Sequence, residues 1–290
     1  MMLTPGVSVG EGHDGTPFFD NRDAGASVYK LDPATAVANR RELLLLSLRE
    51  STNRAPLAQE IFDEIAIAIV DGRLRPGQVL NSVELARRFG TSRTPVREAL
   101  AGLERQGAVV VPPRRKPYVA PVTLRQIKDI YDLRASLFTL AAELIVDECP
   151  TERLAALWRW QEALEDDVAR DAVEDYFWHN VGFRLLEVRL TGNEELQRTI
   201  AGLGIRTLQF RHVSLSQPVR LKESVAQHRR LLLAYDARDK ATATDATRSM
   251  IMAGYRFLRK NYVVNESPGE VSTKDEEEPP PHFTSTQQLR

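Results

Sequence analysis

Two arginines four residues apart could read DNA bases. Arg93 and Arg97 share one face of a predicted helix, because residues at this spacing stand one turn above each other. Arginine donates two hydrogen bonds to guanine O6 and N7, and a helix N-terminus attracts phosphate. A pair of arginines alone is more often simply solvated, so the surrounding elements must decide between the two interpretations. The predicted contacts on this helix are Ser92, Arg93, Thr94 and Arg97.

A carboxylate and two imidazoles could hold a divalent metal. Asp175 and His179 are four residues apart on one predicted helix, and His228 lies on a later one. This set suits zinc or a similar ion, with an effector or water completing the coordination shell. The same residues also suit a hydrogen bond along a helix and an ordinary core histidine. Spacing alone leaves both interpretations open.

Arg134 could bind an acidic ligand. It falls on a helical stripe that is otherwise apolar and consists of Ile127, Tyr131, Phe138 and Ala141. A buried cation needs a partner, which is either a carboxylate of the protein, such as Asp175, or the carboxylate of a ligand. We therefore expect a small carboxylate-type effector, with Arg134, His179 and His228 in its site.

The charge of the chain is unevenly distributed. The formal net charge is −1, but the segment from Arg87 to Lys116 has eight basic and two acidic residues. Its end, Arg114, Arg115 and Lys116, would reach the DNA backbone or minor groove. The segment 263–290 has six acidic and two basic residues and is rich in proline, which predicts a disordered tail. A local basic patch is typical of phosphate binding, although it is also common on a solvated surface.

Composition excludes several classes of protein. The 290 residues are 42% hydrophobic and suffice for about two domains. The single cysteine, Cys149, rules out an intramolecular disulfide and a cysteine-based zinc finger, and no apolar run approaches the roughly 20 residues of a membrane span. The first residues show neither a basic start nor an apolar core of a signal peptide. We expect a soluble, cytoplasmic protein that does not contact membranes.

The arginine pair must be positioned by a small domain, for which we predict residues 56–122. A first helix begins near Leu57, a second covers Ser82–Arg88, and the third starts after Ser92. Two valine-rich runs, Ala108–Val111 and Tyr118–Val122, flank a basic segment that contains prolines. Three helices and a basic hairpin predict a winged helix-turn-helix.

The candidate metal and effector residues belong to a helical domain, predicted at 123–262. A capping box at Thr123–Gln126 opens it, and breaks fall at Pro150, Gly192, Pro218 and near Asp239. We expect an antiparallel bundle of about six helices, which makes the fold mainly α. Residues 1–55 are predicted to form a flexible arm, in which only Ala34–Arg49 could form a docking helix.

The small domain resembles the DNA-binding half of the GntR family of bacterial transcription regulators. The resemblance rests on DGRLRPG (71–77), ELA (84–86), FGTSRTPVREAL (89–100) and LERQG (103–107). It implies base or phosphate contacts at Arg93, Thr94 and Arg97. Two departures are Lys116, where the family usually has glycine, and Val83, where acyl-CoA-sensing members have arginine.

The helical domain is similar to the FCD ligand-binding domain of the FadR branch of this family. The similarity rests on DYFWH (175–179), LTGNEEL (190–196) and QHRRLL (227–232). Many FCD domains bind a metal with one aspartate and three histidines, and this implies roles for Asp175, His179 and His228. Met250 stands where the third histidine is expected. Methionine prefers soft metals, and Met250 also fits simple core packing.

These observations together predict a DNA-binding regulator, by default a repressor, that binds a palindromic operator as a homodimer. A small acidic metabolite would modulate it, with or without a metal. One alternative is a ligand-free DNA-binding dimer with a decayed sensor site. A metal-dependent helical enzyme is a more distant alternative, since no nucleophile, Gly-rich phosphate loop or Ser/His/Asp set accompanies the candidate ligands.

Overall fold

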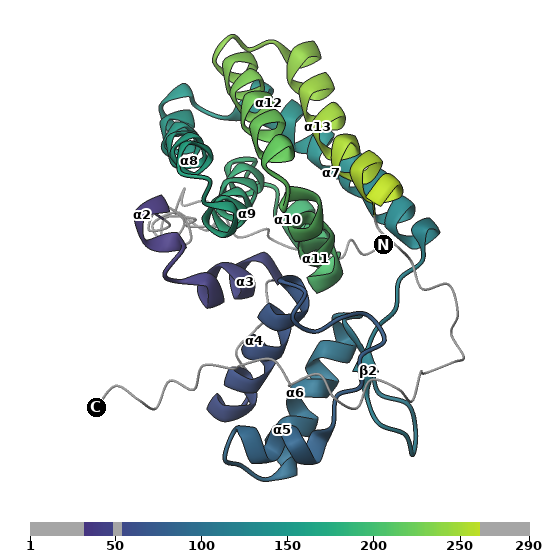
Figure 1. The fold of residues 1–290 in the computed structure, drawn as a ribbon. Helices are drawn as coiled ribbons and strands as arrows, with labels where there is room; N and C mark the ends of the chain where they lie inside the picture. Colours follow the sequence, from purple (N-terminus) through teal and green to yellow (C-terminus); the bar gives the residue numbers. More distant parts are fainter. Residues whose placement is uncertain (1–31, 49–53, 262–290) are drawn as a thin grey trace, which may run out of the picture.

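Three helices and a short hairpin form the small domain (Figure 1). The computed structural model describes residues 32–48 and 54–261. The elements are α4 (Pro56–Val70), α5 (Ser82–Arg88), α6 (Arg93–Arg105), β1 (Val109–Val110) and β2 (Tyr118–Val119). Asn81 caps α5, because its side chain accepts hydrogen bonds from the backbone N–H groups of Val83 and Glu84 in the first turn of this helix. The strands pair antiparallel, with Val109 opposite Val119. The predicted winged helix-turn-helix is confirmed.

Helix α6 packs by the apolar stripe seen in the sequence. Val96, Leu100 and Leu103 are buried against the other helices of the small domain. Ser92 occupies the predicted N-cap position, although its side chain makes no capping hydrogen bond. The opposite face of α6 is thereby turned to solvent.

Seven helices form the second domain, one more than the six expected. They are α7 (Leu124–Glu148), α8 (Thr151–Ala169), α9 (Val173–Leu190), α10 (Glu194–Ala201), α11 (Gly204–Leu215), α12 (Pro218–Asp236) and α13 (Lys240–Asn261). The predicted breaks and the capping box of Thr123 and Gln126 are all present. Two further breaks between helices were not predicted. Each depends on a residue in the left-handed conformation, which the sequence signals only weakly: Asp171 has φ 52° and Gly204 has φ 71°.

Helix α9 lies in the centre of the bundle and is buried on all sides. It approaches α8 closely at Gly182, where an added Cβ would lie 2.1 Å from the ring of Trp160. Glycine therefore permits this close contact. Because α9 has no solvent face, polar residues on it must find partners inside the protein.

The N-terminal segment contributes two helices, α2 (Pro33–Ala36) and α3 (Arg40–Leu48), where a single one was expected. A turn at residues 37–39 separates them. Leu43 and Leu44 of α3 are fully buried, and α3 packs against both α9 and α4. Helix α3 thus lies between the two domains (Figure 1). Residues 1–31, 49–53 and 262–290, including the tail predicted to be disordered, lie outside the described residues.

Within the described ranges, every helix is too short or too polar to span a membrane.

Candidate functional site

The start of α6 presents a polar surface that nothing in the described protein neutralises. Ser92, Arg93, Thr94 and Arg97 are all exposed. Neither arginine forms an ion pair with another described residue, whereas many other surface arginines of the protein do. These two guanidinium groups are available to a phosphate or a base edge.

The wing extends this basic surface. Arg114, Arg115 and Lys116 are exposed, and none forms an ion pair among the described residues. Arg114 has φ 61°, a left-handed conformation that closes the tight turn. The backbone N–H of Val111 donates to Glu104 Oε1 at 3.0 Å, which attaches the wing to α6. This hydrogen bond therefore helps to fix the position of the wing relative to α6.

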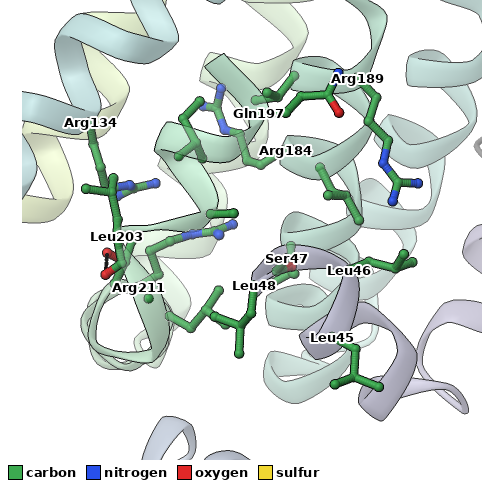
Figure 2. Close-up of a pocket in the computed structure, with 18 of the residues that line it drawn as sticks. Leu45, Leu46, Ser47, Leu48, Arg134, Arg184, Arg189, Gln197, Leu203 and Arg211 are labelled. Carbon is green, nitrogen blue, oxygen red and sulfur yellow. Dashed lines mark hydrogen bonds between the residues drawn. The ribbon is translucent and has the colours of Figure 1, made fainter. Parts of the chain in front are cut away.

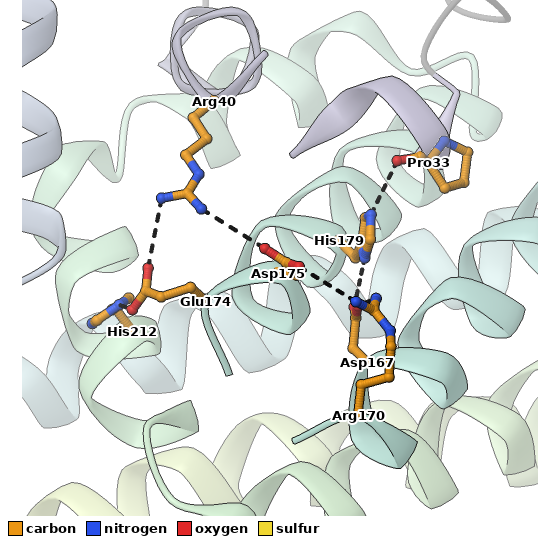
Figure 3. A network of polar contacts seen from close by, with 8 residues as sticks. All are labelled: Pro33, Arg40, Asp167, Arg170, Glu174, Asp175, His179 and His212. Carbon is orange, nitrogen blue, oxygen red and sulfur yellow. Dashed lines mark hydrogen bonds and ion pairs between the residues drawn. The ribbon is translucent and has the colours of Figure 1, made fainter. Parts of the chain in front are cut away.

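Both ring nitrogens of the predicted metal ligand His179 already have hydrogen-bond partners in the protein (Figure 3). Its Nδ1 lies 2.5 Å from Asp167 Oδ2, and its Nε2 lies 3.0 Å from the carbonyl oxygen of Pro33. Burial lowers the pKa of His179, but the Asp167 carboxylate outweighs burial and raises it above the ordinary value. Both neighbours are acceptors, so the imidazolium satisfies both. His179 anchors α2 to the bundle.

Asp175 is also engaged by cations. Its carboxylate lies 3.8 Å from Arg40 and 3.9 Å from Arg170 (Figure 3). Arg40 also reaches Glu174, which accepts a hydrogen bond from His212. Asp175 and His179 thus belong to one polar network that holds the N-terminal helices on α9.

His228 is fully buried elsewhere in the bundle. Its Nε2 lies 3.3 Å from Asn180 Nδ2, and the ring packs edge-on against Phe183. Burial, with a smaller effect from Arg184 and Arg211, lowers the pKa of His228 well below its usual value. The ring is therefore neutral.

The geometry of these residues does not fit a metal. The described part of the chain contains no group of three or more His, Cys, Asp or Glu side chains that could hold an ion. Met250 Sδ, in place of the third histidine, lies 2.6 Å from an arginine nitrogen. A cation beside His228 would be repelled by Arg184 and Arg211.

A cavity of about 810 Å³ lies beside these residues, between α3 and the bundle. Arg134 from α7, Arg184 from α9 and Arg211 from α11 extend toward the same space (Figure 2). Leucines of α3 lie on the opposite side. Pockets for small ligands usually measure roughly 300–1,000 Å³, so the cavity has the size of a ligand site.

Arg134 is buried without an ion pair or a side-chain hydrogen bond among the described residues. It is 4% exposed, its guanidinium lies 5.3 and 5.6 Å from the ring centroids of Tyr131 and Phe138, and Glu187 attracts its charge without contacting it. Asp175, the partner considered from the sequence, pairs with Arg40 and Arg170 instead. Burial lowers the pKa of Arg134 to about 10, so it remains charged at neutral pH. Such a group needs an anion.

Two further arginines were missed by the sequence analysis. Arg184 donates to Glu187 at 2.6 Å, and Tyr235 occupies the other oxygen of this carboxylate. Among the described residues, the guanidinium of Arg211 donates only to the neutral Asn180, to its carbonyl oxygen at 3.1 Å and to its side-chain oxygen at 2.6 Å. Burial, followed by repulsion from the neighbouring arginines, lowers the pKa of Arg211 well below its usual value. Among the described residues, only Arg184 of these three arginines thus forms an ion pair, although the carboxyl groups of Glu42 and Asp63 also line the cavity.

Comparisons with known proteins agree with this division into two domains. Residues 57–119 match bacterial regulatory proteins of the gntR family, and residues 129–253 match the FCD domain.

Individual relatives match most of both domains. The HTH-type transcriptional regulator McbR of Escherichia coli is 27% identical over 71% of this chain and 94% of its own. The gluconate operon transcriptional repressor of Bacillus subtilis is 26% identical over 69% of this chain and 82% of its own. The solved structure of E. coli McbR/YncC superposes with a TM-score of 0.62 at 27% identity, covering 72% of this chain and all of the other.

Proposed function

Because the chain belongs to the GntR family of bacterial transcription regulators and carries an FCD domain, we propose that it is a repressor that binds a palindromic operator as a homodimer and responds to a small acidic effector. Its family and relatives are transcription regulators, not enzymes. Repression is supported by the name of one relative, the gluconate operon repressor. DNA binding makes the bacterial cytoplasm its expected place of action.

The observation that carries this proposal is the exposed start of α6. Arg93 and Arg97 are exposed and form no ion pair with any residue of ranges 32–48 and 54–261, and a recognition helix reads DNA with the residues of its first turns. Ser92 and Thr94 would add contacts to phosphate or bases. The wing residues Arg114–Lys116 would contact the DNA backbone beside the recognition helix.

Operator binding by variants tests the proposal. The wild-type chain first selects its binding site from genomic fragments, and fluorescence anisotropy then gives the affinity. Arg97→Ala should weaken binding by about 1–3 kcal/mol if it contacts a guanine. Arg159→Ala is the matched control, since Arg159 is exposed on α8, far along the chain from the interface. Equal affinity of Arg97→Ala and wild type would refute the assigned helix.

A dimer is supported by an apolar stripe on α7. Leu133 and Leu140 are 46% and 40% exposed, and Leu137 and Leu144 beside them are half-buried. Their spacing of four, three and four residues is that of a helix seam, which a second copy can match across a two-fold axis. We propose that this leucine stripe is the dimer interface. Two copies would then present two recognition helices to two half-sites.

The effector proposal is supported by the three arginines in the cavity. An acid group would supply the missing negative charge at Arg134 and Arg211. His179 and His228, also predicted in this site, make other contacts, although His228 lies close to the same arginines. Effector binding would act by a population shift between placements of the small domain.

The zinc-like metal stays a prediction. Metal analysis of protein purified without chelator or His tag tests it: about one ion per chain would require Asp175, His179 and His228 to rearrange. The alternative of a ligand-free dimer is favoured if no acid or metal changes the melting temperature.

A further inference from the structure

Helix α3 forms one wall of the cavity. Leu45, Leu46, Ser47 and Leu48 line it from the side opposite the arginines (Figure 2). The family matches cover residues 57–119 and 129–253, so neither includes α3. The N-terminal segment therefore adds to this chain a wall that the matched domains do not supply.

Helix α3 is held in place from both domains. Arg40 pairs with Glu174 and Asp175 of α9, while Arg41 pairs with Glu64 of α4 at 2.8 Å. Buried Leu43 and Leu44 fix the helix between these contacts. The cavity-facing leucines are thus held in position before a ligand arrives.

The cavity has two chemically different sides. The guanidinium side carries Arg134, Arg184 and Arg211, and among the described residues only Arg184 of these three forms an ion pair, with the buried Glu187. The rest of the lining is largely apolar and includes the α3 leucines, Leu185 and Val188, but it also contains the polar side chains of Arg41, Glu42, Asp63, Arg189 and Gln197. A small polar diacid would satisfy the first side and leave the second facing water. A ligand with one acid group and an apolar body matches both.

We propose that α3 is the apolar half of the effector site, so that the cavity binds an amphipathic acid, with its carboxylate against the arginines and its apolar body against Leu45, Leu46 and Leu48. This proposal rests on the proposed function, because it takes the arginine cavity as the sensor site. It makes the N-terminal segment a specificity element.

A chain-length series of carboxylates tests the apolar side. Isothermal titration of the full-length protein with butyrate, hexanoate and octanoate should give a gain of about fourfold in affinity for each added methylene that enters the apolar wall. Succinate supplies charge without an apolar body, and 1-octanol supplies the body without charge. Both should bind more weakly than octanoate.

The double variant Leu45→Ser/Leu46→Ser identifies α3 as the wall. It should reduce the gain per methylene to below about twofold. Leu233→Ser is the matched control, since Leu233 is an exposed leucine of α12. An unchanged gain per methylene in the double variant overturns the role of α3.

A second variant serves if the double variant does not fold. Ser47→Leu adds bulk to the apolar side and should weaken octanoate more than butyrate, whereas equal weakening overturns the proposal. Tighter binding of succinate than of octanoate, abolished by Arg134→Leu, would overturn the apolar half alone and leave an acidic effector in place. Binding of none of these acids overturns the amphipathic-acid site, while the operator test of Arg97→Ala still decides the regulator itself.

Discussion

Arg134, which we propose as an effector-binding residue, should reduce the stability of the ligand-free protein. Its charge is buried without an ion pair among the described residues, and the attraction of Tyr131 and Glu187 offsets its desolvation only in part. Arg184 is different, because it pairs with Glu187, whose other oxygen accepts from Tyr235. Two arginines that face one cavity should therefore respond in opposite ways to the same substitution.

We predict that Arg134→Leu stabilises the ligand-free protein by about 1–3 kcal/mol and abolishes acid binding. Arg184→Leu should instead destabilise it by about 3 kcal/mol, because Glu187 would lose its buried cation. Urea unfolding of both variants measures the difference, and titration with octanoate measures binding. Destabilisation by Arg134→Leu would indicate that this arginine has a structural partner rather than an absent ligand.

Asp63 of α4 lines the same cavity and provides a pH test. Burial raises its pKa to about 6, against the lowering effects of a hydrogen bond from Gln59 and of Arg41 and Arg54, while Glu64 raises it further. Between about pH 4 and pH 6, Asp63 therefore keeps its proton in the folded state, whereas the same carboxyl group in the unfolded chain has already lost it. The contribution of the protonated Asp63 to the free energy of unfolding is fully present below about pH 4 and is lost as the pH rises through about 6.

We predict that Asp63→Asn removes this loss. Its advantage over wild type in free energy of unfolding should grow between pH 4 and 7 and reach about 3 kcal/mol, the equivalent of the shift of roughly two pKa units. Asparagine retains an oxygen that can accept from Gln59. Unfolding by urea at several pH values measures the difference, and a constant difference across this range would contradict the assignment.

Elements differ in how well the sequence predicts them. The recognition helix was predicted with its exposed residues because α6 is amphipathic and its spacing is local. Arg134 was found for the same reason, as a polar residue on an apolar stripe of α7. Arg184 was missed because α9 is buried on every side, which leaves no periodicity against which an arginine stands out. Arg211 lies on a short helix whose buried face mixes polar and apolar residues.

Contacts between distant segments were beyond the sequence pattern. His179 and Asp175 were expected to act together, and they do share a network, but with Pro33, Arg40 and Asp167 as partners. His179 and Pro33 are 146 residues apart in the chain, and nothing local announces their contact. The docking of α2 and α3 therefore determines what these side chains do.

At the scale of elements, the leucine stripe of α7 gives a prediction about assembly. Leu133→Glu/Leu140→Glu should convert a dimer into monomers, because two charges would enter an apolar seam. Sedimentation measures the mass, and operator binding should weaken in parallel, since each monomer retains one recognition helix. Leu233→Glu, at another exposed leucine, is the control. A double variant that remains dimeric would assign the interface to another surface.

The cavity is connected to the small domain through several contacts, among them the packing of the cavity-lining helix α11 on α4 and the two contacts that follow. Helix α3 joins α9 to α4 through Arg41 and Glu64. Gly204, at the start of α11 and on the cavity wall, lies so close to the end of α6 that an added Cβ would be 2.8 Å from the carbonyl oxygen of Gln106. A change in the cavity can thus alter the position of the recognition helix without a long chain of intermediates.

Linkage makes this connection measurable. If octanoate weakens operator binding by some factor, the operator must weaken octanoate binding by the same factor, and coupling in proteins is typically about 5- to 150-fold. We predict that Arg41→Ala reduces this factor while changing stability by less than about 1 kcal/mol, because the Arg41–Glu64 pair is partly exposed. Lys240→Ala, which breaks an exposed pair with Asp147 far from the small domain, should leave the factor unchanged.

Anisotropy with and without octanoate gives the change in operator affinity, and titration of octanoate with and without operator gives the change in octanoate affinity, for each variant. Equal coupling in Arg41→Ala and Lys240→Ala would mean that the contacts of α11 with α4 and with the end of α6 carry the signal instead of α3.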